Sequence, residues 1–182
     1  SLETQGGRTL GFHWDERRKR FDKRWDAVVL QEYSTLDPKR PGDPTYYHHY
    51  APLLADLFHR RNRDAQVWLM QTWSRADQTW QPKGNWYGKP IEAMANDLYS
   101  AATSLCTTNP RFAGLLPVGN AWNSAFANGL ADPNPYDGVA FGQVSLWTFD
   151  HYHASAIGYY LEALVVFGRV TGVDPRTLGR DE

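Results

Sequence analysis

An aspartate and a histidine three residues apart give the strongest chemical signal in the sequence. Asp150 and His153 lie immediately before an amphipathic helical pattern. At this spacing the carboxylate can accept a hydrogen bond from one imidazole nitrogen and fix the tautomer, so that the other nitrogen can act as a general base. Ser155 fits the N-cap of the following helix, which would place His153 at a helix start. On spacing alone, a polar loop with capping roles is the simpler interpretation, because the motif is short.

A metal site is another possible use of the same segment. The sequence offers nitrogen and carboxylate ligands, the types that transition metals bind, in Asp150, His151, His153 and the pair His48-His49. Alternate histidines point apart on a helical turn, however, and two adjacent histidines cannot both face one ion. The sequence therefore predicts neither a metal nor another cofactor.

The elements that must position these residues follow from the apolar pattern. Three short apolar runs that end in polar residues predict buried parallel strands at 26–32, 66–72 and 114–119. Pro117 indicates that the third strand is short or lies at an edge. Apolar residues at helical spacing predict helices over 50–58, 91–105 and 155–170. This alternation favours an α/β fold with three layers, in which helices cover both faces of a mainly parallel sheet.

Ligands of such sheets bind at the carboxyl ends of the strands. A long loop rich in proline, glycine and tryptophan, residues 74–90, follows the second strand. Trp80 and Trp86 lie in this loop and Trp73 lies just before it. Because flat aromatic faces bind sugar rings and acyl chains, the three tryptophans are candidates for substrate binding. The alternative is that they pack down as lids on the core.

Composition excludes several classes of protein. The chain has 182 residues, of which 42% are hydrophobic, and this is enough for one globular core. A net charge of -1 argues against a dedicated nucleic-acid-binding protein. No apolar run is long enough for a transmembrane helix. The single cysteine excludes an internal disulfide framework and any multi-cysteine metal site.

The segment from Asp150 to Val165 resembles the C-terminal block of the SGNH (GDSL-type) hydrolases. It reads Asp150-x-x-His153-x-Ser155-x-x-Gly158-x-Tyr160-Leu161-x-Ala163-Leu164-Val165. In that family the Asp-x-x-His pair precedes the last helix and supplies two members of a catalytic triad. The resemblance implies the same roles for Asp150 and His153. It also implies a serine esterase or lipase-like activity and a flavodoxin-like α/β/α sandwich, with a single domain over residues 1–182.

Two upstream segments are similar to further blocks of this family. Gly6-Gly7-Arg8-Thr9-Leu10 resembles the glycine block, whose backbone N–H helps to form the oxyanion hole, so Gly7 is the candidate donor. The family's third block usually ends in Gly-x-Asn-Asp, whereas Gln31-Glu32-Tyr33-Ser34 occupies that place here. Since a glutamine amide can donate to an oxyanion as asparagine does, Gln31 is the second candidate.

The family's nucleophile block is missing from this chain. It follows the first strand and precedes the glycine block, and Gly7 leaves no room for it. None of the eight serines stands in a Gly-Asp-Ser or Gly-x-Ser-x-Gly sequence. We expect the serine, with its strand and helix, upstream of Ser1 or on another polypeptide. Ser34 at a strand end is the fallback nucleophile, and Ser1 with its own amine as base is a second one.

These observations lead to two hypotheses of function. The first is a serine hydrolase of the SGNH type that cleaves a small-molecule or carbohydrate ester. The second is a non-catalytic carbohydrate-binding or scaffold domain on the same fold, which the missing nucleophile and the tryptophan-rich loop favour. Few cysteines and many tryptophans suit a bacterial periplasmic or secreted protein and are also compatible with the cytoplasm. We expect no nucleic-acid partner and no membrane span.

Overall fold

Three strands form the parallel sheet of the protein. The computed structural model describes residues 7–179 and contains β1 (Ala27–Gln31), β2 (Gln66–Gln71) and β3 (Gly114–Pro117), in the order β1-β2-β3. β1 and β2 pair along the whole of β1, with Leu30 opposite Leu69. All three strands occur where the apolar runs predicted them. β3 has four residues and lies at an edge of this sheet, as Pro117 indicated.

The described chain forms two compact units. Unit 1 comprises the residues up to Gln71 together with Asp97–Leu115, and unit 2 comprises Thr72–Asn96 together with the residues from Leu116 onward. The helix α5 (Glu92–Thr108) contributes residues to both units.

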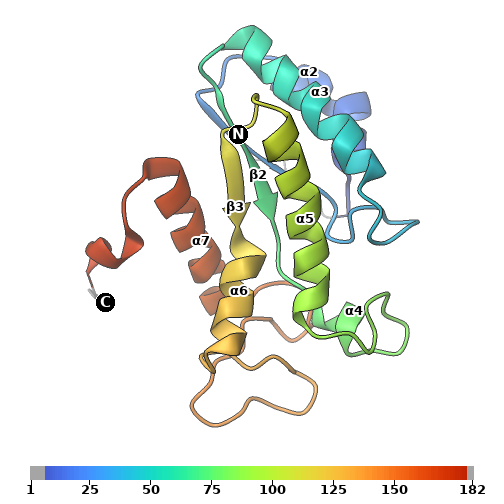
Figure 1. The fold of residues 1–182 in the computed structure, drawn as a ribbon, viewed down its shortest axis with the longest axis vertical. Helices are drawn as coiled ribbons and strands as arrows, with labels where there is room; N and C mark the ends of the chain where they lie inside the picture. The colour runs from blue at the N-terminus through green and yellow to red at the C-terminus, as the bar shows by residue number, and fades with distance from the viewer. Residues whose placement is uncertain (1–6, 180–182) are drawn as a thin grey trace. The chain divides into compact units, whose positions relative to one another are not determined.

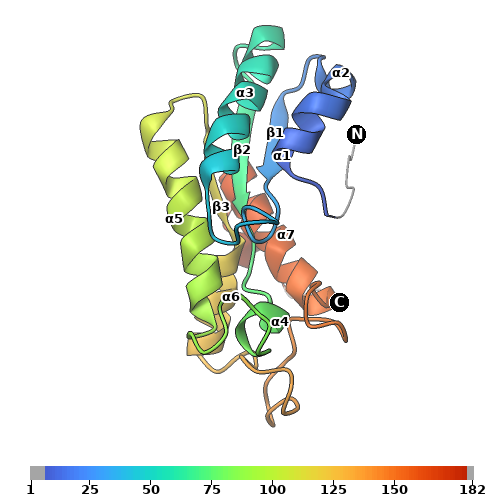
Figure 2. The same cartoon turned by 90° about the vertical axis from the view of Figure 1, so that its right-hand side faces the viewer.

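Unit 1 contains β1, β2 and the helices α1 (Leu10–Phe12), α2 (Arg18–Phe21) and α3 (Thr45–Arg61), with a π-helical turn, η1 (His13–Arg17), between the first two. One face of α3 is buried through Ala51, Leu54 and Phe58, which recur at helical spacing. Figure 2 shows α1 beside α3. The two helices approach closely at Gly11, where an added Cβ would lie 2.7 Å from Cε2 of Tyr50.

Unit 2 contains α4 (Ala76–Thr79), α6 (Val118–Ala127), α7 (Ala156–Thr171) and a 3₁₀ turn, η2 (Pro175–Leu178). Its core is aromatic. The ring of Trp122 stacks on Trp73 with centroids 4.6 Å apart and meets the edge of Trp147 at 5.4 Å. Since Trp122 belongs to α6, these contacts tie the helix to the segments that carry Trp73 and Trp147.

The start of α6 corrects one boundary of the sequence analysis. We expected the third strand to continue to Gly119, but α6 begins at Val118, directly after β3 (Figure 1). Gly119 and Trp122 are therefore buried in a helix and do not stand in a loop after a strand. The physical reason is that a short buried apolar run suits a strand and a buried helix equally well.

The helices predicted over 50–58, 91–105 and 155–170 correspond to α3, α5 and α7. The protein belongs to the α/β class, with a three-stranded parallel sheet and helices on both of its sides, consistent with a sandwich. Within residues 7–179, no helix combines the length and the apolar character that crossing a membrane requires.

Candidate active site

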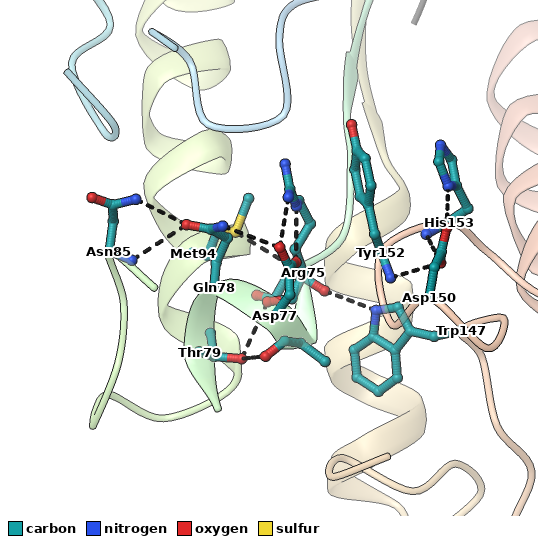
Figure 3. A network of polar contacts seen from close by, with 12 residues as sticks. Arg75, Asp77, Gln78, Thr79, Asn85, Met94, Trp147, Asp150, Tyr152 and His153 are labelled. Carbon is teal, nitrogen blue, oxygen red and sulfur yellow. Dashed lines mark hydrogen bonds and ion pairs between the residues drawn. The ribbon is translucent and has the colours of Figure 1, made fainter. Parts of the chain in front are cut away.

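Asp150 and His153 form a hydrogen-bonded pair in unit 2. Nδ1 of His153 donates to Oδ2 of Asp150 over 2.6 Å, since a carboxylate oxygen can only accept. This bond selects the tautomer that carries its proton on Nδ1 and leaves Nε2 unprotonated. Figure 3 shows the second ring nitrogen on the side away from Asp150. With 57% of its side chain exposed, His153 can present this basic nitrogen to a substrate.

The second oxygen of Asp150 anchors the carboxylate to its own loop. Oδ1 accepts from the Thr148 hydroxyl at 2.8 Å and from the N–H groups of Tyr152 and His153 at 3.0 and 2.9 Å. Partial burial raises the pKa of this carboxyl, but the bonds from His153, Tyr152 and Thr148 outweigh burial and hold the pKa well below its usual range. Asp150 is therefore a fixed anion at neutral pH.

Residues 73–76 hold the loop that carries the pair. The indole N–H of Trp73 donates to the Tyr152 carbonyl at 3.0 Å, and Trp147 donates to the Ser74 carbonyl at 3.1 Å. The N–H of Ala76 donates to the carbonyl of His151 at 3.1 Å. His151 itself has φ of 56°, the left-handed region, and its ring contacts Tyr136 with centroids 4.4 Å apart. Its side chain is thus engaged apart from the Asp150–His153 pair.

Ser155 joins the site to α7, as the sequence predicted. Its hydroxyl oxygen accepts from the N–H of Gly158 at 3.2 Å, which caps the helix, and the same hydroxyl donates to the Ser145 carbonyl at 2.9 Å. His153 therefore stands two residues before the N-cap of α7.

The three candidate tryptophans differ in exposure. Trp73 and Trp86 have exposed fractions of only 9% and 2%, so they are buried, in line with the alternative that they pack on the core. Trp80 is 39% exposed, and its indole N–H donates to the carbonyl of Pro133 at 2.9 Å. Among the three, Trp80 is the one whose side chain is accessible enough to contact a ligand.

The oxyanion candidates and the fallback nucleophile lie in unit 1. Gly7 has φ of 73° and is exposed, Gln31 is the exposed last residue of β1, and Ser34 is half-buried in the turn that follows. Their roles remain predictions. Ser1, the second fallback nucleophile, lies outside the described residues.

The metal alternative gains no support from geometry. Among residues 7–179, no three His, Cys, Asp or Glu side chains form a cluster that could hold an ion. His48 uses Nε2 to donate to the carbonyl of Ala101 at 3.0 Å, within unit 1.

Three site residues escaped the sequence analysis: Thr148, Arg75 and Tyr152. A threonine two residues before an aspartate is a local signal that could have pointed to Thr148. Arg75 and Tyr152 meet although they are far apart in the chain, with Cζ of Arg75 lying 3.7 Å from the Tyr152 ring centroid. No periodicity or spacing encodes that contact.

The chain matches no protein-family model and no curated protein. Among solved structures, it is similar to a DUF4886 family protein from Bacteroides uniformis, with a TM-score of 0.64 and 19% sequence identity over 91% of this chain. The chain spans 58% of the length of that structure. At this identity the likeness concerns the fold alone.

Proposed function

We propose that this chain supplies the general base, and the fold that holds it, of a serine ester hydrolase. The supporting observation is the 2.6 Å bond between His153 and Asp150, whose other oxygen is held by three donors of the same loop. A base needs a free nitrogen, a fixed tautomer and a partner that stabilises its protonated form, and this pair provides all three.

In the proposed reaction, Nε2 of His153 takes the proton of a serine hydroxyl as its oxygen attacks the ester carbonyl. Asp150 orients the ring and stabilises the imidazolium that forms. His153 then gives the proton to the leaving alcohol. In the second half of the reaction, His153 takes a proton from water as the water attacks the acyl-serine, and it returns this proton to the serine oxygen.

The nucleophile is proposed to lie outside residues 1–182, because none of the eight serines stands in a nucleophile motif. The substrate is proposed to be a small-molecule or carbohydrate ester. Trp80 supports this substrate class, since it is a partly exposed aromatic residue in the same unit as His153.

The test compares His153→Ala with His151→Asn in the full polypeptide that contains this chain. Asparagine tolerates the left-handed backbone of position 151, so this control removes a neighbouring imidazole without adding strain. With p-nitrophenyl acetate, we expect kcat to fall by roughly a thousandfold or more for His153→Ala. His151→Asn should stay within a few-fold of the parent protein. Equal losses in both variants would contradict the assignment of the base.

A fluorophosphonate label separates this proposal from the alternative of a non-catalytic carbohydrate-binding or scaffold domain. A labelled serine in the full polypeptide, with labelling slowed by His153→Ala, supports the hydrolase. If no serine reacts while a sugar still quenches the fluorescence of Trp80, the binding function replaces it.

A further inference from the structure

The ring of Tyr152 lies between a cation and the proposed base. Cζ of Arg75 is 3.7 Å from its centroid, and the imidazole of His153 contacts the ring in a tilted arrangement, with centroids 4.3 Å apart and planes 32° apart. Figure 3 shows Tyr152 between these two side chains. All three residues belong to unit 2.

Arg75 is held rigidly where it contacts this ring. Its Nε and Nη2 donate to the two carboxylate oxygens of Asp77 at 3.0 and 2.6 Å, and only 13% of the Arg75 side chain is exposed. Asp77 also accepts from the amide of Gln78 at 3.2 Å, and Asn85 donates to that amide's oxygen at 2.9 Å. The two-pronged pairing fixes the plane of the guanidinium as well as its position.

The Tyr152 ring has little freedom of its own. Its backbone is fixed on both sides, because the N–H donates to Asp150 and the carbonyl accepts from Trp73. The guanidinium then restricts the remaining rotation of the ring. The bond from Nδ1 to Asp150 still allows the imidazole of His153 to tilt about that contact, and the tyrosine face limits this tilt.

We propose that Arg75 is a positioning residue for His153, acting through the ring of Tyr152 that contacts both side chains. The proposal rests on the proposed function of His153 as the base. Asp150 sets which nitrogen carries the proton, whereas Arg75 and Tyr152 set the direction in which Nε2 points. Small errors in the direction of a base are costly, since a displacement of about 1 Å can lower the rate roughly a hundredfold.

The first test measures the orientation of the His153 ring by NMR and does not depend on activity. Because the two ring centroids lie 4.3 Å apart, the ring current of Tyr152 shifts the Hδ2 and Hε1 resonances of His153. In the full polypeptide, we expect this shift to disappear in Tyr152→Leu, to diminish in Arg75→Gln, and to be restored in Tyr152→Phe, which keeps the ring. An unchanged His153 spectrum in Arg75→Gln overturns the proposal.

The second test measures kcat and KM for ester hydrolysis. Arg75→Gln and Tyr152→Leu should lower kcat by roughly tenfold to a hundredfold while KM stays within about twofold, because neither residue is proposed to bind substrate. A displaced His153 resonance with an unchanged kcat also overturns the proposal. Failure of the proposed function would be recognised separately, since His153→Ala would then retain activity with Arg75 intact.

Loss of folding is distinguished by a matched variant. Arg75→Gln leaves the partly buried carboxylate of Asp77 without its cation, and Arg75→Gln/Asp77→Asn removes this penalty. If the double variant regains the parent thermal midpoint but keeps the low kcat and the altered His153 spectrum, positioning is supported. If kcat recovers together with the midpoint, Arg75 has only a structural role.

Discussion

At the scale of single residues, Asp150 divides two tasks between its two oxygens. Oδ2 accepts from the imidazole of His153, while Oδ1 accepts from Thr148 and from two backbone N–H groups. The three donors on Oδ1 fix the rotation of the carboxylate about its own bond. As a result, the oxygen facing His153 is always the same one, and the proton on Nδ1 stays on the side of the imidazole that faces Asp150.

Asp150→Asn tests this division of tasks. The three donors would keep the amide oxygen at the place of Oδ1, so the amide NH₂ would face Nδ1 of His153 and donate to it. The histidine would then carry its proton on Nε2, where it cannot act as a base. We expect kcat for ester hydrolysis to fall on the order of a thousandfold or more, with little change in the thermal midpoint.

Asp174→Asn is the control for Asp150→Asn. This aspartate also pairs with a neighbouring cation, Arg176, at 2.6 Å, but it is the N-cap of the 3₁₀ turn η2. Its kcat should match the parent protein. A folded Asp150→Asn variant with full activity would show that the pair does not serve catalysis.

At the scale of elements, the sequence predicted the side-chain contact between residues close in the chain and missed the one between distant loops. Asp150 and His153 are three residues apart, so their contact depends only on one turn and the cap at Ser155. The contact between Arg75 and Tyr152 depends on how two distant loops pack, which no spacing reveals. The positions of strands and long helices were predictable because burial of one face imposes a period on the sequence.

Aromatic residues were the least predictable part of the site. Trp73 and Trp80 stand seven residues apart near the same loop, yet one stacks on Trp122 in the core and the other is exposed. Tryptophan is apolar enough to be buried, and its polar N–H also suits it to a surface. The residue type therefore does not predict whether a given tryptophan is buried or exposed. Its place follows from the packing partners that the fold provides.

Gly158 provides a prediction at this scale. It is the buried glycine in the first turn of α7, and a Cβ there would meet the carbonyl oxygen of Leu146 and lie 2.7 Å from Cζ2 of Trp122. Alanine normally favours a helix over glycine by about 1 kcal/mol. Here the clash with backbone should prevail, and we expect Gly158→Ala to lower the free energy of unfolding by about 1 to 3 kcal/mol in urea denaturation.

Gly168→Ala, in the same helix, is the comparison. Its added Cβ would lie 3.1 Å from ring atoms of Pro175, near the end of the described chain, rather than against a backbone oxygen of the core. We expect this variant to lower the free energy of unfolding by less than Gly158→Ala does. Equal or reversed losses would show that α7 can shift away from Leu146 and Trp122 at little cost.

At the scale of the whole molecule, the candidate base is only one part of the proposed enzyme. The chain spans 58% of the length of the DUF4886 family structure to which it is similar. We propose that the nucleophilic serine lies outside residues 1–182. Assays of the full polypeptide are therefore the ones that bear on function. Stability, in contrast, depends on groups within the chain, and the buried carboxyl of Glu32 is the clearest of these.

Glu32 couples the stability of the fold to pH. Its exposed fraction is 6%, and Oε1 accepts from the N–H groups of Leu10 and Tyr33 at 3.1 and 2.7 Å. Oε2 is buried with no hydrogen-bond partner among residues 7–179. Burial raises the pKa of this carboxyl to about 7, against the opposing effect of the two N–H groups. Since the unfolded chain loses this proton near its ordinary pKa of about 4.3, the folded state binds more protons between these values.

Because the folded state binds more protons, the free energy of unfolding falls as pH rises from about 4.3 to about 7, and it is constant above that range. We expect ionisation of Glu32 to lower the free energy of unfolding by about 2 to 3 kcal/mol between pH 5 and pH 8. Glu32→Gln keeps an oxygen for Leu10 and Tyr33 but cannot ionise, so its unfolding free energy in urea should lack this decline. Glu16→Gln, at an exposed carboxylate of η1, should retain the parent pH dependence. A Glu32→Gln profile parallel to that of the parent protein would mean that Glu32 is ionised in the folded state throughout this range.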